Sequence, residues 1–390
     1  MARIWNQHKQ ISPHTKTFGV GVNAPLKRKV FVGLSGGVDS AVSAALLKQR
    51  GFDVTGVFIK VWQPDFLPCS WRDERRDAMK VAIALDIPFL FFDFEQEYKR
   101  GVVDKMIAEY RVGRTPNPDV LCNKEVKFGA FWKKARELGA DLIATGHYVQ
   151  ILRESTKVKP LCCQLSEGKD KEKDQSYFLW TLTQNDLSHI LFPIGHLEKS
   201  EVRKLARKYN LPVSEKKDSQ GICFIGDVSM DEFLSHFIST KSGDVLDTRG
   251  EIIGTHRGAP LYTIGERHGF EITEKQPDDG AFYILSKDME TNTLTVSNKE
   301  PEIISLSPTK ITVKNINWLT EATPPLICRA RIRYRGEKLP VVIKLGQHAV
   351  SKRIIVEFRE PVRGLSLGQS IVFYDGDVCL GGGVMNKIIK

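Results

Sequence analysis

Two kinds of residue in this chain could do chemistry: small polar residues beside glycines, and cysteines on polar loops. The first kind gathers in Gly33–Ser40, which reads Gly-Leu-Ser-Gly-Gly-Val-Asp-Ser between the apolar run Val30–Val32 and a helical pattern over Ala41–Arg50. That order predicts a strand, a tight turn and a helix start, where backbone N–H groups favour an anion. The glycines permit close approach, and hydroxyl and carboxylate oxygens can meet phosphate or a metal. We expect a nucleotide phosphate there.

The second segment, Gly113–Gly129, contains Cys122. Its prolines, Pro116 and Pro118, predict a stiff loop that cannot be helical and that presents Asn117, Asp119 and Cys122. Cationic neighbours at positions 114, 124 and 127 favour an accessible thiol with a lowered pKa. Inert packing is the alternative for a lone cysteine.

The third segment, Lys216–Asp227, carries Cys223 in a glycine-containing loop. Basic neighbours favour a reactive thiol, whereas Ile222, Phe224 and Ile225 fit a buried strand residue equally well. This segment alone leaves the two interpretations balanced.

Alternation of β-rich and helical patterns positions these residues. The expected strands cover residues 30–34, 54–61, 89–94 and 142–145, and the expected helices cover residues 39–50, 73–85, 98–112 and 126–138. This pattern predicts a parallel sheet flanked by helices, with ligands beyond the carboxyl ends of the strands. Glu154–Lys173 is polar and lysine-rich, which predicts a mobile surface loop, and Gln175–Asn210 is expected to be mostly helical.

From Gly243 onward, short alternating strands and turns predict two small β domains or barrels. The fold class is therefore α/β, with an N-terminal Rossmann-like domain resembling adenine-nucleotide hydrolases, a small central domain and a C-terminal β-barrel-like domain. The expected bounds are a disordered extension over 1–29, a catalytic domain over 30–225, a central α+β domain over 226–305 and a barrel domain over 306–390.

Composition limits the class of protein. The chain has 390 residues, 41% of them hydrophobic, and no apolar run approaches the roughly 20 residues of a membrane span. A formal net charge of +10 favours a polyanionic partner. Seven cysteines without a secretory signal favour reduced thiols, and we expect a cytoplasmic protein. The acid-free basic leader Met1–Lys29 is interpreted as an extension and not as a transit peptide.

Several motifs together carry a resemblance to a known family. Ser35–Ser40 looks like the pyrophosphatase loop of enzymes that cleave ATP to AMP and pyrophosphate. With it, the chain resembles the tRNA-specific 2-thiouridylase family, and the match covers nearly everything after the leader. The matching segments are Gly33–Ser40, Arg114–Asn123, Ala144–Tyr148, Lys173–Leu179, Lys217–Gly226 and Cys379–Gly383.

The resemblance implies a reaction. ATP would adenylate the 2-oxygen of a wobble uridine in tRNA, and sulfur from a cysteine persulfide would then replace it. Cys223 would bear the persulfide. Cys122 would release the sulfur or resolve the persulfide as a disulfide, and Asp119 would act as acid or base.

The resemblance also implies binding roles. ATP would contact Gly33, Leu34, Ser35, Gly36, Gly37, Val38, Asp39, Ser40, Ile59 and Gly146. The tRNA would contact Asn117, Pro118, Asp119, His147, Lys173, Asp174, Gln175, Arg333, Tyr334 and Gln369. Mg²⁺, tRNA and a sulfur-donor persulfide carrier are the expected partners of a monomer, with no resident metal. Position 59 is Ile where relatives often have Met.

Other interpretations stay open. His147 could be a hydrogen-bonded residue at a strand end, and Tyr334 a core residue. Cys162 and Cys163 are expected to be incidental, and Cys328 and Cys379 to be packing. An iron–sulfur cluster on Cys69, Cys122 and Cys223 ranks below the two-thiol mechanism, because their spacing matches no known cluster. The competing functions are an amide-forming ligase with the same loop and a non-catalytic tRNA-binding nucleotide sensor.

Overall fold

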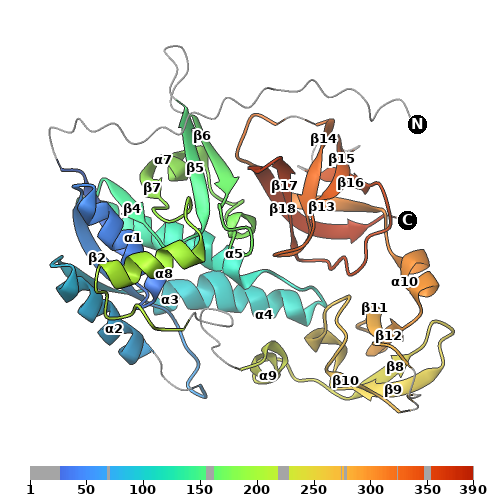
Figure 1. The fold of residues 1–390 in the computed structure, drawn as a ribbon. Coiled ribbons are helices and arrows are strands. Elements are labelled where there is room, and N and C mark those ends of the chain that lie inside the picture. The colour runs from blue at the N-terminus through green and yellow to red at the C-terminus, as the bar shows by residue number, and fades with distance from the viewer. Residues whose placement is uncertain are drawn as a thin grey trace.

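The computed structural model describes residues 27–67, 71–154, 162–217, 228–273, 275, 279–322, 324–346 and 353–389. It contains a parallel sheet with helices, a central antiparallel-rich sheet and a C-terminal barrel (Figure 1). Within those ranges, no helix combines the length and the apolar character that crossing a bilayer requires. The predicted α/β class, with a parallel sheet followed by a small central part and a barrel, is confirmed.

The N-terminal sheet has the strand order β3-β2-β1-β4-β7, and every pairing in it is parallel. Its strands are β1 Lys29–Gly33, β2 Asp53–Lys60, β3 Phe89–Asp93, β4 Leu142–Ala144 and β7 Ile190–Leu191. Strand order reverses on the two sides of β1, because β2 and β3 lie on one side and β4 and β7 on the other. Ligands of such sheets bind beyond the carboxyl ends at this switch point.

Helices cover both faces of this sheet. Along β1, Val30 and Val32 pack with α1 Val38–Gln49, α2 Trp71–Ala84 and α8 Lys199–Lys208, whereas Phe31 belongs to the core on the opposite face. Successive side chains of β1 therefore point to opposite faces of the sheet and belong to two separate cores. The opposite face is covered by α3 Glu95–Tyr98, η1 Lys99–Val103, α4 Asp104–Arg111, α5 Pro118–Cys122, η2 Asn123–Ala130 and α6 Phe131–Glu137.

The segment predicted to be a non-helical loop is helical from Pro118 onward, so that prediction is wrong. Pro118 occupies the first turn of α5, where no backbone N–H is needed, and Asn117 precedes it with extended dihedrals. The helix continues through the π-helical turn η2 into α6. A Cβ at Gly129 would lie 2.7 Å from the Lys124 carbonyl oxygen, which explains a glycine in this widened turn.

Residues 162–167 are also not the surface loop that was predicted. Strands β5 Val149–Glu154 and β6 Cys162–Glu167 form an antiparallel hairpin, while residues 155–161 lie outside the described ranges. β6 also pairs with the barrel through Ser166 and Val378. The stretch 175–210 is only partly helical, in η3 Ser176–Phe178, α7 Gln184–His189 and α8.

The central part is a five-stranded sheet in the order β10-β9-β8-β12-β11, with α9 Met230–Ser235 before it and α10 Glu300–Leu306 after it. A turn at Asp247–Gly250 joins β8 to β9, with the Gly250 N–H donating to the Asp247 carbonyl at 3.1 Å. The other elements are β8 Gly243–Leu246, β9 Ile252–His256, η4 Ala259–Leu261, β10 Phe270–Ile272, β11 Tyr283–Asp288 and β12 Thr293–Ser297.

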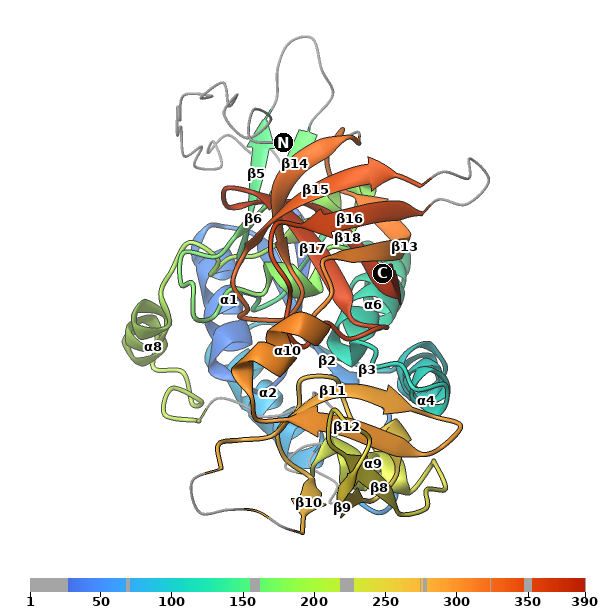
Figure 2. The same ribbon diagram turned by 90° about the vertical axis from the view of Figure 1, so that its right-hand side faces the viewer.

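The C-terminal strands close into a barrel, because β13 pairs with both β16 and β18 (Figure 2). The strands are β13 Lys310–Trp318, β14 Leu326–Arg331, β15 Leu339–Leu345, β16 Ile354–Phe358, β17 Ser370–Asp375 and β18 Val378–Ile388. β14 ends at Arg331, so Arg333 and Tyr334 lie in the turn that follows this strand.

Hydrogen bonds fix the barrel to the N-terminal part. The buried Tyr177 hydroxyl donates to the Ser370 carbonyl at 2.9 Å, and the Trp180 indole donates to the Ser370 hydroxyl at 3.0 Å. From the barrel side, the Asn317 amide donates to the carbonyls of Trp180 and Leu182, both at 2.7 Å. Residues 177–182 and the barrel therefore hold each other in one arrangement.

Candidate active site

The predicted phosphate loop lies at the switch point of the sheet. β1 ends at Gly33, the Leu34 N–H donates to the Val57 carbonyl at 2.7 Å, and α1 begins at Val38. The Ser40 hydroxyl lies 3.2 Å from the Ser35 hydroxyl and accepts from the Ser35 N–H at 3.2 Å. This side chain ties the loop to the first turn of α1, whose N–H groups favour an anion.

Asp39 is held by two residues that the sequence did not single out. Its Oδ1 accepts from the Tyr148 hydroxyl at 2.7 Å and from the Lys199 ammonium at 2.7 Å, and its Oδ2 accepts from Lys199 at 2.9 Å. Tyr148 is buried, whereas 32% of the Asp39 side chain is exposed. The carboxylate is therefore oriented in advance but stays accessible.

The two residues outside Gly33–Ser40 that the resemblance assigns to ATP, Ile59 and Gly146, lie at the same edge of the sheet. Gly146 follows β4, and a Cβ there would lie 2.7 Å from the Ser40 nitrogen, so this position must be small for the β4 loop to lie against α1. Ile59 lies near the carboxyl end of the neighbouring strand β2 and is half-buried. The structure thus brings both positions to the phosphate loop's edge.

His147 lies in an aromatic box and not at the surface. Its ring packs against Phe128 and Phe192 at centroid distances of 5.7 and 5.8 Å, and its Nδ1 shares a 2.7 Å hydrogen bond with the Thr145 hydroxyl. Burial, with a smaller contribution from Lys127, holds the pKa of His147 well below its usual value. This arrangement matches the hydrogen-bonded residue at a strand end, and the box joins the β4 loop to the helix that starts at Pro118.

The depressed pKa of His147 predicts a pH dependence of stability. Below about pH 6.5 the unfolded chain binds a proton at position 147 that the folded chain does not bind. The contribution of the neutral His147 ring to the free energy of unfolding is therefore complete above about pH 6.5. It falls as the pH drops toward the pKa of His147 in the folded state. We expect urea unfolding to show that the wild type loses up to about 1.4 kcal/mol per pH unit more than His147→Asn does between about pH 6.5 and 5.

The comparison between these two proteins removes the shared contribution of His196 and His256, whose pKa values are also lowered by burial. Parallel stability profiles of the wild type and His147→Asn over this range would contradict the burial of a neutral ring at position 147.

Asn117 and Gln369, both assigned to tRNA contact by the resemblance, bind each other. The Asn117 amide donates to the Gln369 side-chain oxygen at 2.7 Å, and its own oxygen accepts from the Ser370 N–H at 2.6 Å. The preceding residues are also fixed, since the Thr115 N–H donates to the Leu367 carbonyl at 2.9 Å and Arg114 donates to the Met385 carbonyl at 3.1 Å. The corner before α5 is therefore built jointly by the N-terminal part and the barrel.

Asp119 and Cys122 lie one helical turn apart in α5. Asp119 is half-buried in the first turn, and Cys122 is only 3% exposed. The expectation of an accessible thiol at position 122 is wrong for this conformation, because the helix buries that side chain in the core that covers the sheet.

Cys223 and Cys69 lie outside the described residues, but the chain leading to Cys223 is anchored at the phosphate loop. The Lys216 ammonium donates to the Gly36 carbonyl at 3.1 Å and to Asp77 at 2.9 Å, and this bond lowers the pKa of Asp77. Cys223 follows Lys216 by seven positions, which a fully extended chain spans in about 25 Å at most.

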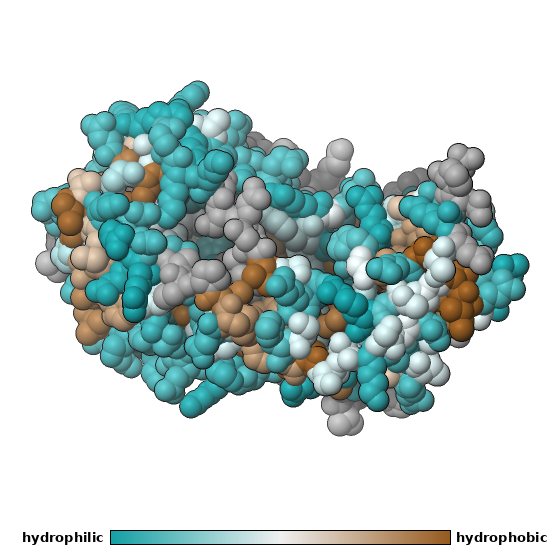
Figure 3. Space-filling view, turned by 90° about the horizontal axis from the view of Figure 1, so that it is seen from below, coloured by the Kyte–Doolittle hydropathy of each residue, from teal (hydrophilic) through white to brown (hydrophobic). Residues whose placement is uncertain are grey.

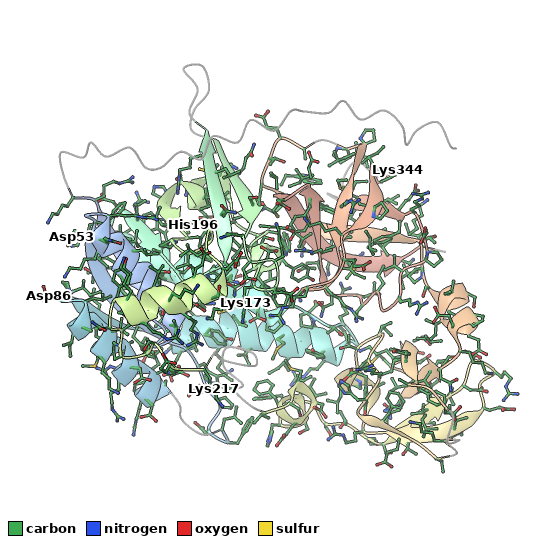
Figure 4. All side chains as sticks on the ribbon, viewed as in Figure 1. Asp53, Asp86, Lys173, His196, Lys217 and Lys344 are labelled. Atoms are coloured by element: carbon green, nitrogen blue, oxygen red, sulfur yellow. The ribbon has the colours of Figure 1, made fainter. Side chains whose placement is uncertain are left out.

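The three residues of the segment Lys173–Gln175 differ in their burial and in their hydrogen-bond partners. Lys173 is half-buried, and Figure 4 labels it in the middle of the molecule, with Lys217 below it. Asp174 is 3% exposed and accepts from Ser176, from the Gly168 N–H at 3.1 Å and from Arg331 at 2.8 Å. Its carboxylate therefore faces the barrel. The Gln175 side-chain oxygen accepts from the Tyr148 N–H at 3.0 Å, which links this segment to the Asp39 cluster.

Arg333 joins the central part to the barrel. Its guanidinium donates to the Ile264 carbonyl at 2.8 Å and to the Gly364 carbonyl at 2.6 Å, and burial lowers its pKa. Tyr334 packs against Phe178 at a centroid distance of 4.5 Å and is half-buried. Both side chains therefore contact residues outside the barrel, Arg333 in the central part and Tyr334 in η3.

Cys163, Cys328 and Cys379 have environments of packing residues. Cys163 and Cys379 are completely buried, and burial raises the pKa of both Cys379 and Cys328 to about 12. Among the described residues, no group of three or more His, Cys, Asp or Glu side chains could hold a metal. The less favoured iron–sulfur alternative includes two positions, Cys69 and Cys223, that lie beyond those residues, so the structure does not test it.

The fold and this site define a nucleotide-binding α/β enzyme with a pyrophosphatase-type loop. A family model described as "tRNA methyl transferase HUP domain" matches residues 28–227, one described as "tRNA methyl transferase PRC-barrel domain" matches residues 231–298, and one described as "Aminomethyltransferase beta-barrel domain" matches residues 308–385. These three matches follow the order of the parallel sheet, the central sheet and the barrel.

Curated relatives are similar over almost their whole length. "tRNA-specific 2-thiouridylase MnmA" of Nitrosomonas eutropha is 44% identical over 370 residues, which are 93% of this chain and 99% of the relative. The protein of the same name from Listeria innocua is 40% identical over 366 residues, which are 93% of this chain and 95% of the relative. The chain belongs to the tRNA-specific 2-thiouridylase family and is therefore an enzyme of the sulfurtransferase class.

Among solved structures, a 4-thiouridine synthetase in complex with RNA and bound ATP is 20% identical, with a TM-score of 0.31. The match covers 49% of this chain and 43% of that chain. At that TM-score, the likeness says nothing about this chain's substrate.

Proposed function

We propose that this enzyme uses ATP to replace the 2-oxygen of a wobble uridine in tRNA by sulfur. The observation that carries the proposal is the meeting of two sites at one edge of the sheet. The phosphate loop contacts Gly146, and the adjoining His147 packs on the helix that bears Asp119 and Cys122. Family membership names the substrate class, since the relatives are tRNA 2-thiouridylases.

ATP is proposed to bind with its pyrophosphate end on Gly33–Ser40 and its adenosine between Ile59 and Gly146. The first turn of α1 supplies N–H groups toward the phosphates. Oxygen ligands at Ser35, Asp39 and Ser40 fit Mg²⁺, which prefers one or two carboxylates together with substrate phosphates. The ion would neutralise phosphate charge when bound.

The uridine is proposed to enter beside Asn117–Asp119. Its 2-oxygen attacks the α-phosphorus of ATP, the bond from that phosphorus to the bridging oxygen breaks, and pyrophosphate leaves with the electron pair. Adenylation converts a poor leaving group into AMP. Asp119, in the first turn of α5, is placed to move a proton at the base, because it follows the corner that Asn117 and Gln369 fix.

Sulfur is proposed to arrive as a persulfide on Cys223, loaded by a persulfide-carrying donor protein. Either the persulfide's outer sulfur attacks C2 and AMP leaves, after which Cys122 attacks the Cys223 sulfur, breaks the sulfur–sulfur bond and frees the 2-thiouridine, or Cys122 first displaces the outer sulfur as sulfide, which then attacks C2 and expels AMP. Both routes end with a disulfide between Cys122 and Cys223, and a thiol reductant must supply two electrons to restore them. The bond requires the two Cα atoms to approach within about 7 Å.

The surface supports a polyanionic partner. The net charge is +10, and the face in Figure 3 is mainly hydrophilic, with separated apolar patches. The partners proposed are thus tRNA and a sulfur donor, with a monomeric enzyme acting in the cytoplasm.

The purified protein with tRNA, ATP, Mg²⁺ and a sulfide or persulfide donor should yield AMP, pyrophosphate and 2-thiouridine in equal amounts. Mass analysis of the digested tRNA measures the nucleoside, and a reaction without ATP is the control. Nucleotide cleavage without any thiolated nucleoside would contradict the proposal. tRNA binding without cleavage would instead favour a nucleotide sensor.

A further inference from the structure

The ammonium of Lys199 points onto the phosphate loop from a distant part of the chain. It bonds both oxygens of Asp39, at 2.7 and 2.9 Å, and lies 5.8 Å from the centre of the Tyr148 ring. Only 16% of the Lys199 side chain is exposed. A lysine from α8, 160 residues away in the sequence, thus reaches the first turn of α1.

The position of this lysine is not explained by the helix that carries it. Lys199 is the first residue of α8, and a cation at a helix N-terminus is unfavourable because the helix dipole is positive there. Glu198 and Glu201 already cap this end, and the Lys199 N–H donates to Asp170 at 2.9 Å. The backbone is therefore fixed, while the side chain leaves the helix and extends to Asp39.

We propose that Lys199 is a phosphate-binding residue of the ATP site. Before ATP binds, its ammonium neutralises Asp39, and when ATP binds, the ammonium moves to an oxygen of the β- or γ-phosphate. Exchange of one anionic partner for another keeps the charge-assisted bond throughout. The inference rests on the proposed use of ATP, and it assigns the pyrophosphate end of the nucleotide to Lys199.

Two other residues at the phosphate loop have different roles in this arrangement. Tyr148 is buried, and its hydroxyl keeps one bond to the carboxylate when the ammonium moves, so it acts as a positioning residue. Lys216, the other lysine at the loop, bonds the Gly36 carbonyl and Asp77 and so supports the loop backbone. Among these residues, only Lys199 offers a positive charge beside the accessible carboxylate at the start of α1.

The test compares ligands that do and do not carry the pyrophosphate end. Dissociation constants of α,β-methylene ATP, inorganic pyrophosphate and AMP are measured by calorimetry for the wild type and for Lys199→Met, without tRNA or a sulfur donor. Loss of a hydrogen bond between charged groups weakens binding roughly 10- to 100-fold. We expect that loss for α,β-methylene ATP and pyrophosphate, and a change of less than about twofold for AMP.

Matched variants separate binding from folding. Lys199→Arg keeps the charge and should recover most of the affinity for pyrophosphate, whereas Lys204→Met changes an exposed lysine on the same helix and should match the wild type. Lys199→Gln, whose amide can still donate to Asp39, repeats the comparison in a variant that preserves part of the cluster. Thermal unfolding without nucleotide identifies any variant that is not folded.

An equal loss of affinity for AMP and for α,β-methylene ATP, or no loss for either, would overturn the role of Lys199. The outcome is independent of tRNA chemistry. If the wild type binds these nucleotides but forms no 2-thiouridine, the proposed function is contradicted, whereas the phosphate-binding role of Lys199 is not. If 2-thiouridine forms and Lys199→Met binds pyrophosphate as the wild type does, only the phosphate-binding role of Lys199 is contradicted.

Discussion

Replacing either Cys122 or Cys223 by Ser should lower the formation of 2-thiouridine at least about a thousandfold. Cys122→Ser removes the attacking thiol, and Cys223→Ser removes the thiol that carries the persulfide. A serine hydroxyl cannot bear a persulfide and is a much weaker nucleophile. Binding of α,β-methylene ATP should stay within about twofold, since neither thiol belongs to the phosphate loop. Thionucleoside analysis and calorimetry measure the two effects on the same preparations.

Cys328→Ser is the matched control for this experiment. Burial raises the pKa of the Cys328 thiol to about 12, and the residue lies in β14 of the barrel, so the exchange should leave thiolation unchanged. Full turnover in Cys122→Ser or Cys223→Ser would favour the amide-forming ligase, which needs neither thiol. Because Cys122 is buried, thermal unfolding must show that its Ser variant is folded.

Gly36→Ala should abolish nucleotide binding and destabilise the protein by about 2 to 4 kcal/mol. Gly36 has a φ of +74°, and a Cβ there would overlap the Glu74 carbonyl oxygen, which is backbone of α2 and cannot rotate away. Moving the loop would also break the Lys216 bond to the Gly36 carbonyl. Urea unfolding and calorimetry with α,β-methylene ATP measure the two losses.

Two alanine variants divide this effect into its causes. Gly51 has a φ of +84°, and a Cβ added there would meet no atom within 4 Å, so Gly51→Ala should lose only about 1 kcal/mol of stability. At Gly37 a Cβ would meet only the Ser35 hydroxyl at 3.3 Å, and the backbone is extended, so the fold should tolerate Gly37→Ala. Equal stability of all three variants would contradict the close approach of α2.

The parallel sheet and the phosphate loop were predictable because local patterns specify them. Strand and helix periods alternate along the chain, and the glycines lie between an apolar strand and a helix. The helix from Pro118 was missed because the second proline was interpreted as a helix breaker, although the first turn of a helix accepts it. The strand from Cys162 was missed because the polar, lysine-rich composition of this stretch predicts a surface loop. The strand instead belongs to a hairpin that pairs with the barrel.

Long-range contacts decide the part of the site that the sequence did not predict. Asn117 and Gln369 were both candidates, yet nothing local indicates that they bind each other across 252 positions. Asp174 was assigned by its motif, but its burial depends on Arg331 from the barrel. Tyr148 lies inside a motif that was noted, so that motif was the available signal. No signal in the sequence indicated Lys199, because its neighbours are ordinary residues of a basic helix.

The partners of the corner before α5 are synthesised much later than the corner itself. Arg114 and Asn117 leave the ribosome long before Met385 and Gln369, which are 271 and 252 residues further along the chain. β18 also closes the barrel against β13, so these bonds form only after the final strand is available. Contacts of such wide separation form slowly. The parallel sheet can therefore acquire its core on the nascent chain, while the corner that would receive the base waits until β18 has been synthesised.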